Sequence, residues 1–239
     1  MAKQTMPVFF TSPSWQMNGV NVFTMNLARG LAKNGTRATV LLTDPTLQET
    51  IPMARPTDLD FVELNIRPDE PMMLRWRRLR RFLEAQSPCI YIPNYDWNLS
   101  GICPQLPNSI AVVGIVHADD PRHYEHLDRL GDTWTATVAV SDQIGKTIRQ
   151  TRPQFASRLH VIPIGVDIPA ASSMATVPGA RLRILYAGLL NRFQKRVFDV
   201  VDITRQLIEC RTPVELTFSG GGDDEAELRQ ACGDLVEDG

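Results

Sequence analysis

The chain has 239 residues, a formal net charge of −2 and a hydrophobic content of 43%. That length fits one or two domains of about 150 residues each, and the apolar content is enough for a buried core, which excludes intrinsic disorder. The weak net charge gives no electrostatic basis for binding nucleic acid.

Cysteine usage and hydropathy indicate the compartment. The four cysteines are far apart and form no C-x-x-C pair, which argues against a zinc ribbon or a disulfide framework and favours a reducing environment. No stretch of about 18 apolar residues is present. We therefore expect a soluble protein of the cytoplasm.

Short apolar runs alternate with helical patterns over the first two thirds of the chain, which is typical of a parallel sheet wrapped by helices. This pattern predicts a doubly wound, Rossmann-like α/β domain over residues 1–170. The predicted strands are 7–11, 38–43, 58–64, 89–93, 109–116, 133–140 and 158–162, and the clearest helices are 20–35, 71–86 and 141–150.

A second α/β unit follows over residues 181–239, after a hinge and linker at 171–180. Before the linker, Pro163 and Gly165 predict a sharp turn with a positive φ at the glycine, and with it a cleft between two domains. The unit is expected to be a partial domain, because two parallel strands do not close a core by themselves. Its predicted elements are a strand at 181–187, a helix at 196–210, a strand at 214–219 and a helix at 223–235.

Several motifs occur in a characteristic order. They are Asn18-Gly19-Val20, the apolar strand that ends at His117, VAVSDQIGKTI at 138–148, VIPIGVD at 161–167, ILYAGLLNRFQKR at 184–196 and FSGGGDDEAEL at 218–228. Together they resemble the retaining glycosyltransferases of the GT-B fold, specifically family four (group 1), over nearly the whole chain. The resemblance implies a GT-B-like arrangement with an acceptor-side domain first and a nucleotide-sugar-binding domain second. The family's two spaced glutamates match no position in residues 1–239.

The first loop carries Asn18 and Gly19 at the start of a predicted helix. Backbone N–H groups at that helix end are suited to a diphosphate or an acceptor oxygen. The family often has two glycines here, and we expect Asn18 to replace one of them in a left-handed conformation. The simpler interpretation is an ordinary helix cap. The G-x-G-x-x-G pattern of dehydrogenases is absent.

His117 is the candidate catalytic residue. It ends the most apolar strand, so its side chain is expected at the carboxyl edge of the sheet. The resemblance implies contact with the donor sugar, for which an imidazole can donate a hydrogen bond or support developing charge. A structural histidine at a strand end is the plainer alternative.

The segment HADDPRHYEHLD also allows a metal site, because His123 and His126 are three residues apart beside Asp119 and Asp120. Helix capping by the aspartates explains the same residues, and the resemblance requires no protein-bound metal. We therefore expect none.

The donor phosphates are expected to be bound by the second unit. The family has Gly-Arg and then Lys after the first strand of that domain; this chain has Gly188, Leu189 and Lys195. Arg192 is a candidate substitute for the missing arginine, since arginine and lysine bind phosphate by charge-assisted hydrogen bonds. A solvated helix start is the alternative. Small residues that let the backbone approach the nucleotide are expected at Gly220 and Gly222.

Residues 72–86 form a strongly basic amphipathic segment. Two interpretations stay open: arginines exposed to solvent above a packed apolar stripe, and peripheral contact with an anionic membrane at its inner face. The arginines are Arg75, Arg77, Arg78, Arg80 and Arg81.

The resemblance thus implies transfer of a sugar from a nucleoside diphosphate to an acceptor with retention of configuration, and no further cofactor. Part of the donor pocket is expected to be missing from this chain. Leu189 and the partial second unit favour a rival from another class, a non-catalytic sugar- or nucleotide-binding protein on a degenerate GT-B fold. A metal-dependent hydrolase built on the His/Asp segment is a weaker alternative.

Overall fold

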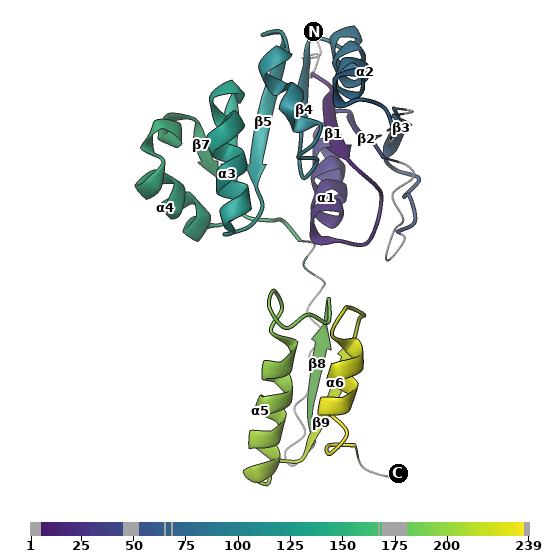
Figure 1. Ribbon diagram of the computed structural model, residues 1–239, viewed down its shortest axis with the longest axis vertical. Helices are drawn as coiled ribbons and strands as arrows, with labels where there is room; N and C mark the ends of the chain where they lie inside the picture. The colour runs from purple at the N-terminus through teal and green to yellow at the C-terminus, as the bar shows by residue number, and fades with distance from the viewer. Residues whose placement is uncertain are drawn as a thin grey trace. The chain divides into compact units, whose positions relative to one another are not determined.

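The structure of the protein is a computed structural model that describes residues 6–44, 53–64, 66–67, 69–166, 168 and 181–236. The chain divides into two compact units, Met1–Ile168 and Pro169–Gly239. The predicted linker at 171–180 lies outside the described residues. The two units are drawn in Figure 1, and each is described by itself below.

The first unit is built on a seven-stranded sheet in which every neighbouring pair is parallel, with the order β3-β2-β1-β4-β5-β6-β7. The chain first winds from β1 to β3 and then in the other direction from β4 to β7, so the predicted doubly wound fold is confirmed. The order reverses between β1 and β4. The strands are β1 (Val8–Ser12), β2 (Ala38–Leu42), β3 (Asp60–Glu63), β4 (Cys89–Ile92), β5 (Ile110–Val116), β6 (Ala136–Ala139) and β7 (Leu159–Val161).

Side-chain caps define where the helices of this unit begin. The Ser141 hydroxyl accepts from the backbone N–H of Ile144, and the Asp120 carboxylate accepts from that of Arg122, which confirms the capping role expected for Asp120. The helices are α1 (Gly19–Lys33), α2 (Met72–Ala85), α3 (Pro121–Leu130) and α4 (Asp142–Thr151), with 3₁₀ turns η1 (Ser100–Gln105), η2 (Gly131–Thr133) and η3 (Pro153–Arg158). In the described residues no helix has the length and apolar character needed to span a bilayer.

Strand β5 shows why one glycine lies in the middle of an apolar run. A Cβ at Gly114 would be 2.0 Å from the ring of Trp134, which is itself 1% exposed. The indole therefore packs directly on the strand backbone. The neighbours Val113 and Ile115 point to the opposite face, where they line a groove with Phe23 of α1.

The second unit contains a two-stranded parallel sheet of β8 (Leu182–Ala187) and β9 (Val214–Ser219), with helices α5 (Val197–Glu209) and α6 (Glu225–Ala231) (Figure 1). Its buried apolar residues are Leu190, Val197, Val201 and Leu228. The predicted helix at 223–235 is too long, since α6 ends at Ala231. Gly233 follows the C-cap residue Cys232, and glycine disfavours continuation of a helix by about 1 kcal/mol.

The turn after β7 also differs from the prediction. Gly165 does not adopt a positive φ. Its carbonyl lies 3.5 Å from the side-chain amide of Asn26 in α1. The turn therefore needs no left-handed backbone at Gly165, and the glycine meets no conformational requirement there.

Candidate functional site

Polar side chains gather where β1, β4 and β5 end. In an open parallel sheet, ligands bind outside the carboxyl ends of the strands at the point where the strand order reverses. That point lies between β1 and β4 in this unit. Ser12 ends β1, Asn94 follows β4 and His117 follows β5. The structure therefore brings the predicted His117 to the edge at which a doubly wound fold binds its ligand.

A chain of three hydrogen bonds fixes the imidazole of His117. The Thr24 hydroxyl donates to the carbonyl of Val20 at 2.8 Å, so it accepts from the Asn94 amide nitrogen at 2.6 Å. The amide oxygen of Asn94 then faces His117 Nε2 at 2.8 Å. Because a carbonyl oxygen only accepts, Nε2 carries the proton and Nδ1 is the acceptor atom of the ring.

His117 is also uncharged. Burial and the neighbouring His123 lower its pKa from 6.5 to about 3. Its single N–H is used on Asn94, so in this structure His117 presents an acceptor rather than a donor, and its expected contact with the donor sugar stays a prediction. The ring can accept a hydrogen bond from a hydroxyl through Nδ1. Phe23 packs edge-on against it, with 5.0 Å between ring centroids.

The loop between β1 and α1 is held by a residue that the sequence did not single out. Asn21 is 1% exposed, and its amide nitrogen donates to the carbonyls of Ser14 and Gln16 at 3.0 and 2.8 Å. Its amide oxygen accepts from the Ser12 hydroxyl at 2.9 Å. The backbone of this loop is therefore fixed from inside the helix that follows it.

Asn18 acts as the helix cap. Its φ of −150° is extended, not left-handed as expected, and its side chain accepts from the backbone N–H of Asn21 at 2.8 Å. At Gly19, a Cβ would meet nothing within 4 Å. The glycine is thus not required by the packing of the chain, and open space lies beside this helix N-terminus.

The His/Asp segment builds an aromatic cluster. His126 Nε2 lies 2.8 Å from the Ser100 hydroxyl, and burial lowers the pKa of His126 to about 4. His123 packs between His117 and Trp97, at ring-centroid distances of 6.4 and 5.4 Å. Across the described ranges, no group of three His, Cys, Asp or Glu residues is arranged to hold a metal ion. The geometry gives the hydrolase alternative no support.

A separate apolar groove of about 570 Å³ runs between α1 and the exposed face of β4, β5 and β6. Aliphatic side chains such as Leu27, Ile92 and Val138 line it, together with Pro163. Its polar lining residues, Asn26, Arg29 and Lys33, all lie on α1 and the rest of the lining is apolar, whereas sugar and phosphate recognition needs convergent polar groups. The polar edge around His117 is therefore the better candidate site in the first unit.

In the second unit, two glycines allow two loops to touch. A Cβ at Gly220 would be 1.9 Å from the carbonyl oxygen of Gly188, and one at Gly222 would be 2.4 Å from that of Leu190. Both Gly188 and Gly220 have positive φ. We expected Gly220 and Gly222 to let the backbone come close to a nucleotide. In the structure they let it come close to the backbone of Gly188 and Leu190.

Arg192 is engaged by acids from the neighbouring loop. Its backbone N–H and its Nε donate to the Asp224 carboxylate at 2.8 and 3.1 Å, and its guanidinium also pairs with Glu227. Both acids raise the pKa of Arg192, with Glu227 contributing most. The guanidinium stacks over Phe198 at 4.7 Å. Arg192 therefore holds the two loops together, and its charge is balanced within the protein.

Lys195 lies in the same loop and is exposed. Within the described part of the chain, its ammonium group has no carboxylate partner. The Asn191 side chain shapes this loop by accepting from the backbone N–H groups of Phe193 and Gln194 at 2.9 and 2.8 Å. Leu189 is 42% exposed beside it. A free cation on a fixed loop is the feature that an anionic ligand requires.

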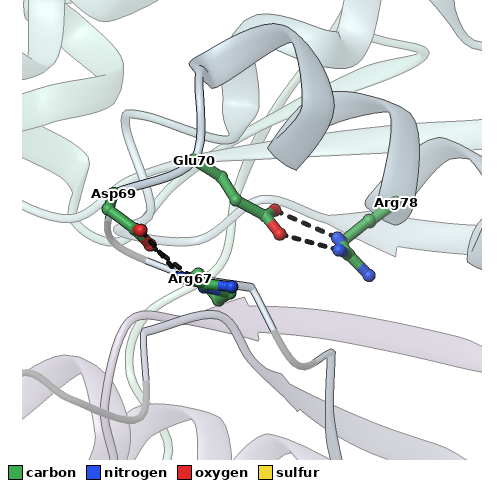
Figure 2. Close-up of polar contacts among 4 residues, drawn as sticks. All are labelled: Arg67, Asp69, Glu70 and Arg78. Atoms are coloured by element: carbon green, nitrogen blue, oxygen red, sulfur yellow. Dashed lines mark hydrogen bonds and ion pairs between the residues drawn. The ribbon is translucent and has the colours of Figure 1, made fainter.

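The basic helix α2 is partly neutralised. Figure 2 shows Arg78 facing the Glu70 carboxylate with two hydrogen bonds of 2.7 and 3.0 Å, next to the Arg67–Asp69 pair. Glu70 raises the pKa of Arg78. Arg80 pairs with Glu84 one turn further along the helix.

Comparison with known proteins identifies the class. The family model described as Glycosyltransferase Family 4 matches residues 17–169, which include the polar edge around His117. The protein therefore belongs to glycosyltransferase family 4, as its motifs predicted. None of the curated proteins compared with the chain matches it.

Solved structures agree on the fold. The chain matches the apo form of the lipopolysaccharide outer core galactosyltransferase WaaB with a TM-score of 0.69 and 16% identity, over 97% of this chain and 65% of that one. It matches the pneumococcal O-GlcNAc transferase GtfA, in complex with UDP and GlcNAc, with a TM-score of 0.74 and 9% identity, over 97% and 74%. Anabaena Alr3699/HepE, in complex with UDP and glucose, matches with a TM-score of 0.64 and 16% identity, over 96% and 66%. The predicted GT-B-like fold is confirmed, and the chain spans 65% of the length of WaaB.

Proposed function

We propose that the protein takes part in transferring a sugar from a nucleoside diphosphate to an acceptor, with retention of configuration. The observation that carries the proposal is the position of His117 in a member of this family, at the carboxyl edge where the strand order reverses. UDP is named in two of the similar structures, so uridine nucleotides are the first donors to test.

In this proposal, Lys195 binds the diphosphate of the donor. Departure of a nucleoside diphosphate leaves negative charge on the phosphate oxygens, and an ammonium group stabilises that charge through charge-assisted hydrogen bonds. Arg192 contributes by holding the loop, since Asp224 and Glu227 already balance its charge. Gly188, Gly220 and Gly222 let the two loops close on each other beneath the nucleotide.

His117 binds the donor sugar as a neutral acceptor in this scheme. A sugar hydroxyl donates to Nδ1 while Nε2–H stays on Asn94. The acceptor hydroxyl attacks on the face that the diphosphate leaves, which gives retention. The loop at Asn18 and Gly19 offers backbone N–H groups to an acceptor or phosphate oxygen.

Nucleotide binding and turnover test this function. UDP-glucose, UDP-galactose and UDP-N-acetylglucosamine are each incubated with the protein in the presence of a chelator, and UDP release is measured. We expect the wild-type protein to bind UDP. We expect Lys195→Ala to raise the dissociation constant for UDP about tenfold. Lys146→Ala, which removes an exposed lysine from α4, is the matched control. If neither UDP nor any UDP-sugar binds, or if both variants behave alike, the proposed donor site is wrong.

The second candidate is a non-catalytic sugar- or nucleotide-binding protein. Leu189 at the position of the family's arginine, and the internal neutralisation of Arg192, both favour it. Such a protein binds UDP without releasing it from a UDP-sugar. The same assay therefore separates the two candidates, and the anomeric configuration of any product, measured by proton NMR, tests retention.

Helix α2 supports a further part of the proposal, contact with the inner surface of an anionic membrane. Met73 and Leu74 are 64% and 43% exposed, and Arg77 and Arg81 are exposed on the same helix. Exposed apolar and basic groups on one helix suit the lipid headgroup region.

Vesicle sedimentation tests this contact. We expect binding to vesicles that contain phosphatidylglycerol, weaker binding to phosphatidylcholine alone, and loss of binding in the double variant Arg77→Glu, Arg81→Glu. The control, Lys146→Glu with Arg149→Glu, reverses two exposed charges on α4. Unchanged binding after the α2 change removes the membrane contact and leaves the sugar-transfer proposal untouched.

A further inference from the structure

Two aromatic rings lie beside the candidate site and have no part in the function proposed so far. Tyr95 and Trp97 come directly after Asn94, the residue that fixes His117. They therefore follow β4 at the edge where the strand order reverses. Tyr95 is 42% exposed and Trp97 is partly exposed, which is unusual for large aromatic side chains next to a buried polar network.

The buried imidazole rings of His123 and His126 pack against this exposed aromatic pair. The centroids of Tyr95 and Trp97 are 4.8 Å apart at an angle of 45°. His123, 6% exposed, contacts Trp97 edge-on at 5.4 Å and Tyr95 at 5.8 Å. His126 lies behind Trp97 at 6.0 Å. The two rings are thus fixed in orientation, and His123 also contacts His117, so the surface pair and the candidate catalytic residue share one neighbour.

A planar guanidinium group, paired with a carboxylate, lies beside the pair formed by Tyr95 and Trp97. The guanidinium of Arg122 lies 5.9 Å from the Trp97 ring and forms two hydrogen bonds of 3.1 Å with the carboxylate of Asp120. Throughout the described residues, neither the Tyr95 hydroxyl nor the Trp97 indole N–H has a hydrogen-bond partner. The surface therefore combines apolar ring faces with free donors and a paired carboxylate–guanidinium group.

That combination matches the chemistry of a pyranose ring. One face of a pyranose presents C–H groups, which pack on aromatic rings, and its rim presents hydroxyls, which pair with planar polar side chains and indole N–H groups. A free phosphate would not use the aromatic ring faces. The site belongs to the first unit, whereas Lys195 belongs to the second.

We infer that Tyr95 and Trp97 form the binding platform for the acceptor, and that the acceptor is a saccharide whose terminal pyranose ring stacks on Tyr95. This inference rests on the proposed sugar transfer for its role but not for the binding itself. It names the class of acceptor, a glycan.

Saturation-transfer NMR on the full 239-residue chain, with no nucleotide present, tests the platform. The probes are methyl α-glucopyranoside, methyl α-galactopyranoside and methyl α-N-acetylglucosaminide at millimolar concentration, the range expected for a single ring. We expect transfer to the axial ring protons of at least one probe. Tyr95→Ala should weaken binding about tenfold through loss of apolar contact, and Tyr95→Phe, which keeps the ring, should retain it within about threefold.

The controls separate this inference from the proposed function. Met6→Ala removes an apolar side chain that is 44% exposed just before β1 and should leave the saccharide signals unchanged, while circular dichroism shows that each variant is folded. No transfer from any probe, or equal transfer in wild type and Tyr95→Ala, overturns the platform even if UDP-sugar turnover is observed. Tyr95-dependent binding without UDP binding supports the platform and rejects the donor site.

Discussion

Asn94 is the residue on which the state of His117 depends. It adopts φ 53°, a left-handed conformation that asparagine and aspartate tolerate best among residues with a side chain. We predict that Asn94→Ala lowers UDP-sugar turnover about tenfold, because the imidazole of His117 loses the hydrogen bond that fixes its tautomer. A tenfold loss is at the lower end of what residues that orient a functional side chain contribute. The substitution also leaves the imidazole N–H without its protein partner, which costs about 1–3 kcal/mol of folding free energy.

The variant Asn94→Asp separates positioning from packing. A carboxylate accepts from Nε2–H as the amide oxygen does, and its charge raises the pKa of His117 from about 3 toward the ordinary value. Nitrogen-15 shifts of the imidazole report both properties. Wild type should show a protonated Nε2 and no titration of His117 above pH 5, whereas Asn94→Asp should titrate at higher pH. A wild-type ring protonated at Nδ1 would contradict the assigned hydrogen-bond chain.

Leu189 offers a gain-of-function prediction. Its side chain is 42% exposed beside the loop that carries Lys195, so an arginine can replace it without being buried. We predict that Leu189→Arg tightens UDP binding about tenfold through one charge-assisted hydrogen bond, measured by calorimetry. Leu185→Arg, at a position on β8 that is 67% exposed, adds the same charge elsewhere in the unit. Equal tightening in both variants would mean a general effect of charge.

At the residue scale, sequence predicted the groups with distinctive chemistry and missed those that orient them. His117 was found because it ends an apolar strand, and Asp120 because caps follow local rules. Asn94 was missed because its partner is set by the fold: it pairs with Thr24, 70 residues away. Asn21 was missed although its partners Ser12, Ser14 and Gln16 are close in sequence, because the conformation of the loop that brings them together was not predicted. The engagement of Arg192 was missed for the same reason, because Asp224 reaches it from another loop.

At the element scale, Gly114 of β5 tests how closely Trp134 packs on the sheet. We predict that Gly114→Ala destabilises the first unit by about 1–3 kcal/mol, because the added methyl group overlaps a buried indole that cannot move away. Gly30→Ala in α1 is the opposite case: its Cβ would meet nothing within 4 Å, so we expect stabilisation of about 0.5–1 kcal/mol. Urea unfolding followed by tryptophan fluorescence measures both.

Element boundaries followed from periodicity wherever an apolar run was bounded by polar or glycine residues. Strand β9 and the start of β2 match the predicted positions, and β3 is shorter than the predicted 58–64 by residues at both ends. Strand order was not readable from the sequence, because nothing local shows that β4 lies beside β1. That neighbourhood creates the candidate site, so the site as a whole required the fold.

At the scale of the whole molecule, the two units differ in what keeps them folded. The first unit has an extensive apolar core packed on a seven-stranded sheet, whereas the second unit has four buried apolar residues and a two-stranded sheet. All four tryptophans, Trp15, Trp76, Trp97 and Trp134, belong to the first unit. Their fluorescence therefore reports the unfolding of that unit inside the intact chain.

This signal tests the pH dependence that the buried histidines impose. In the folded unit, burial lowers the pKa of His117 to about 3 and that of His126 to about 4, while unfolded histidine titrates near 6.5; the pKa of His123 is lowered as well. Between these values the unfolded state binds more protons than the folded state. Stability is therefore fully present above pH 6.5 and is lost as the pH falls toward 3.

Asp96 acts in the opposite sense. Burial raises the pKa of this carboxyl, which accepts hydrogen bonds from Thr43 and from the backbone of Leu99, so it contributes stability at acid pH that is lost as the pH rises through its folded pKa. As the pH falls from 6.5 to 5, the three buried histidines lose stabilising free energy, whereas Asp96 gains it. Because the histidines are more numerous, the free energy of unfolding decreases over this range. The wild-type urea midpoint should fall over that range.

Two histidine variants test whether the buried imidazole of His117 causes this loss of stability. His117→Gln keeps an N–H donor for Asn94 and removes one titrating group, so its midpoint should change less with pH than that of wild type. His160→Gln, which removes the exposed histidine of β7, is the matched control. If His117→Gln and wild type lose stability equally between pH 6.5 and 5, His117 is already charged in the folded protein, and its assignment as a neutral acceptor of a sugar hydroxyl fails with it.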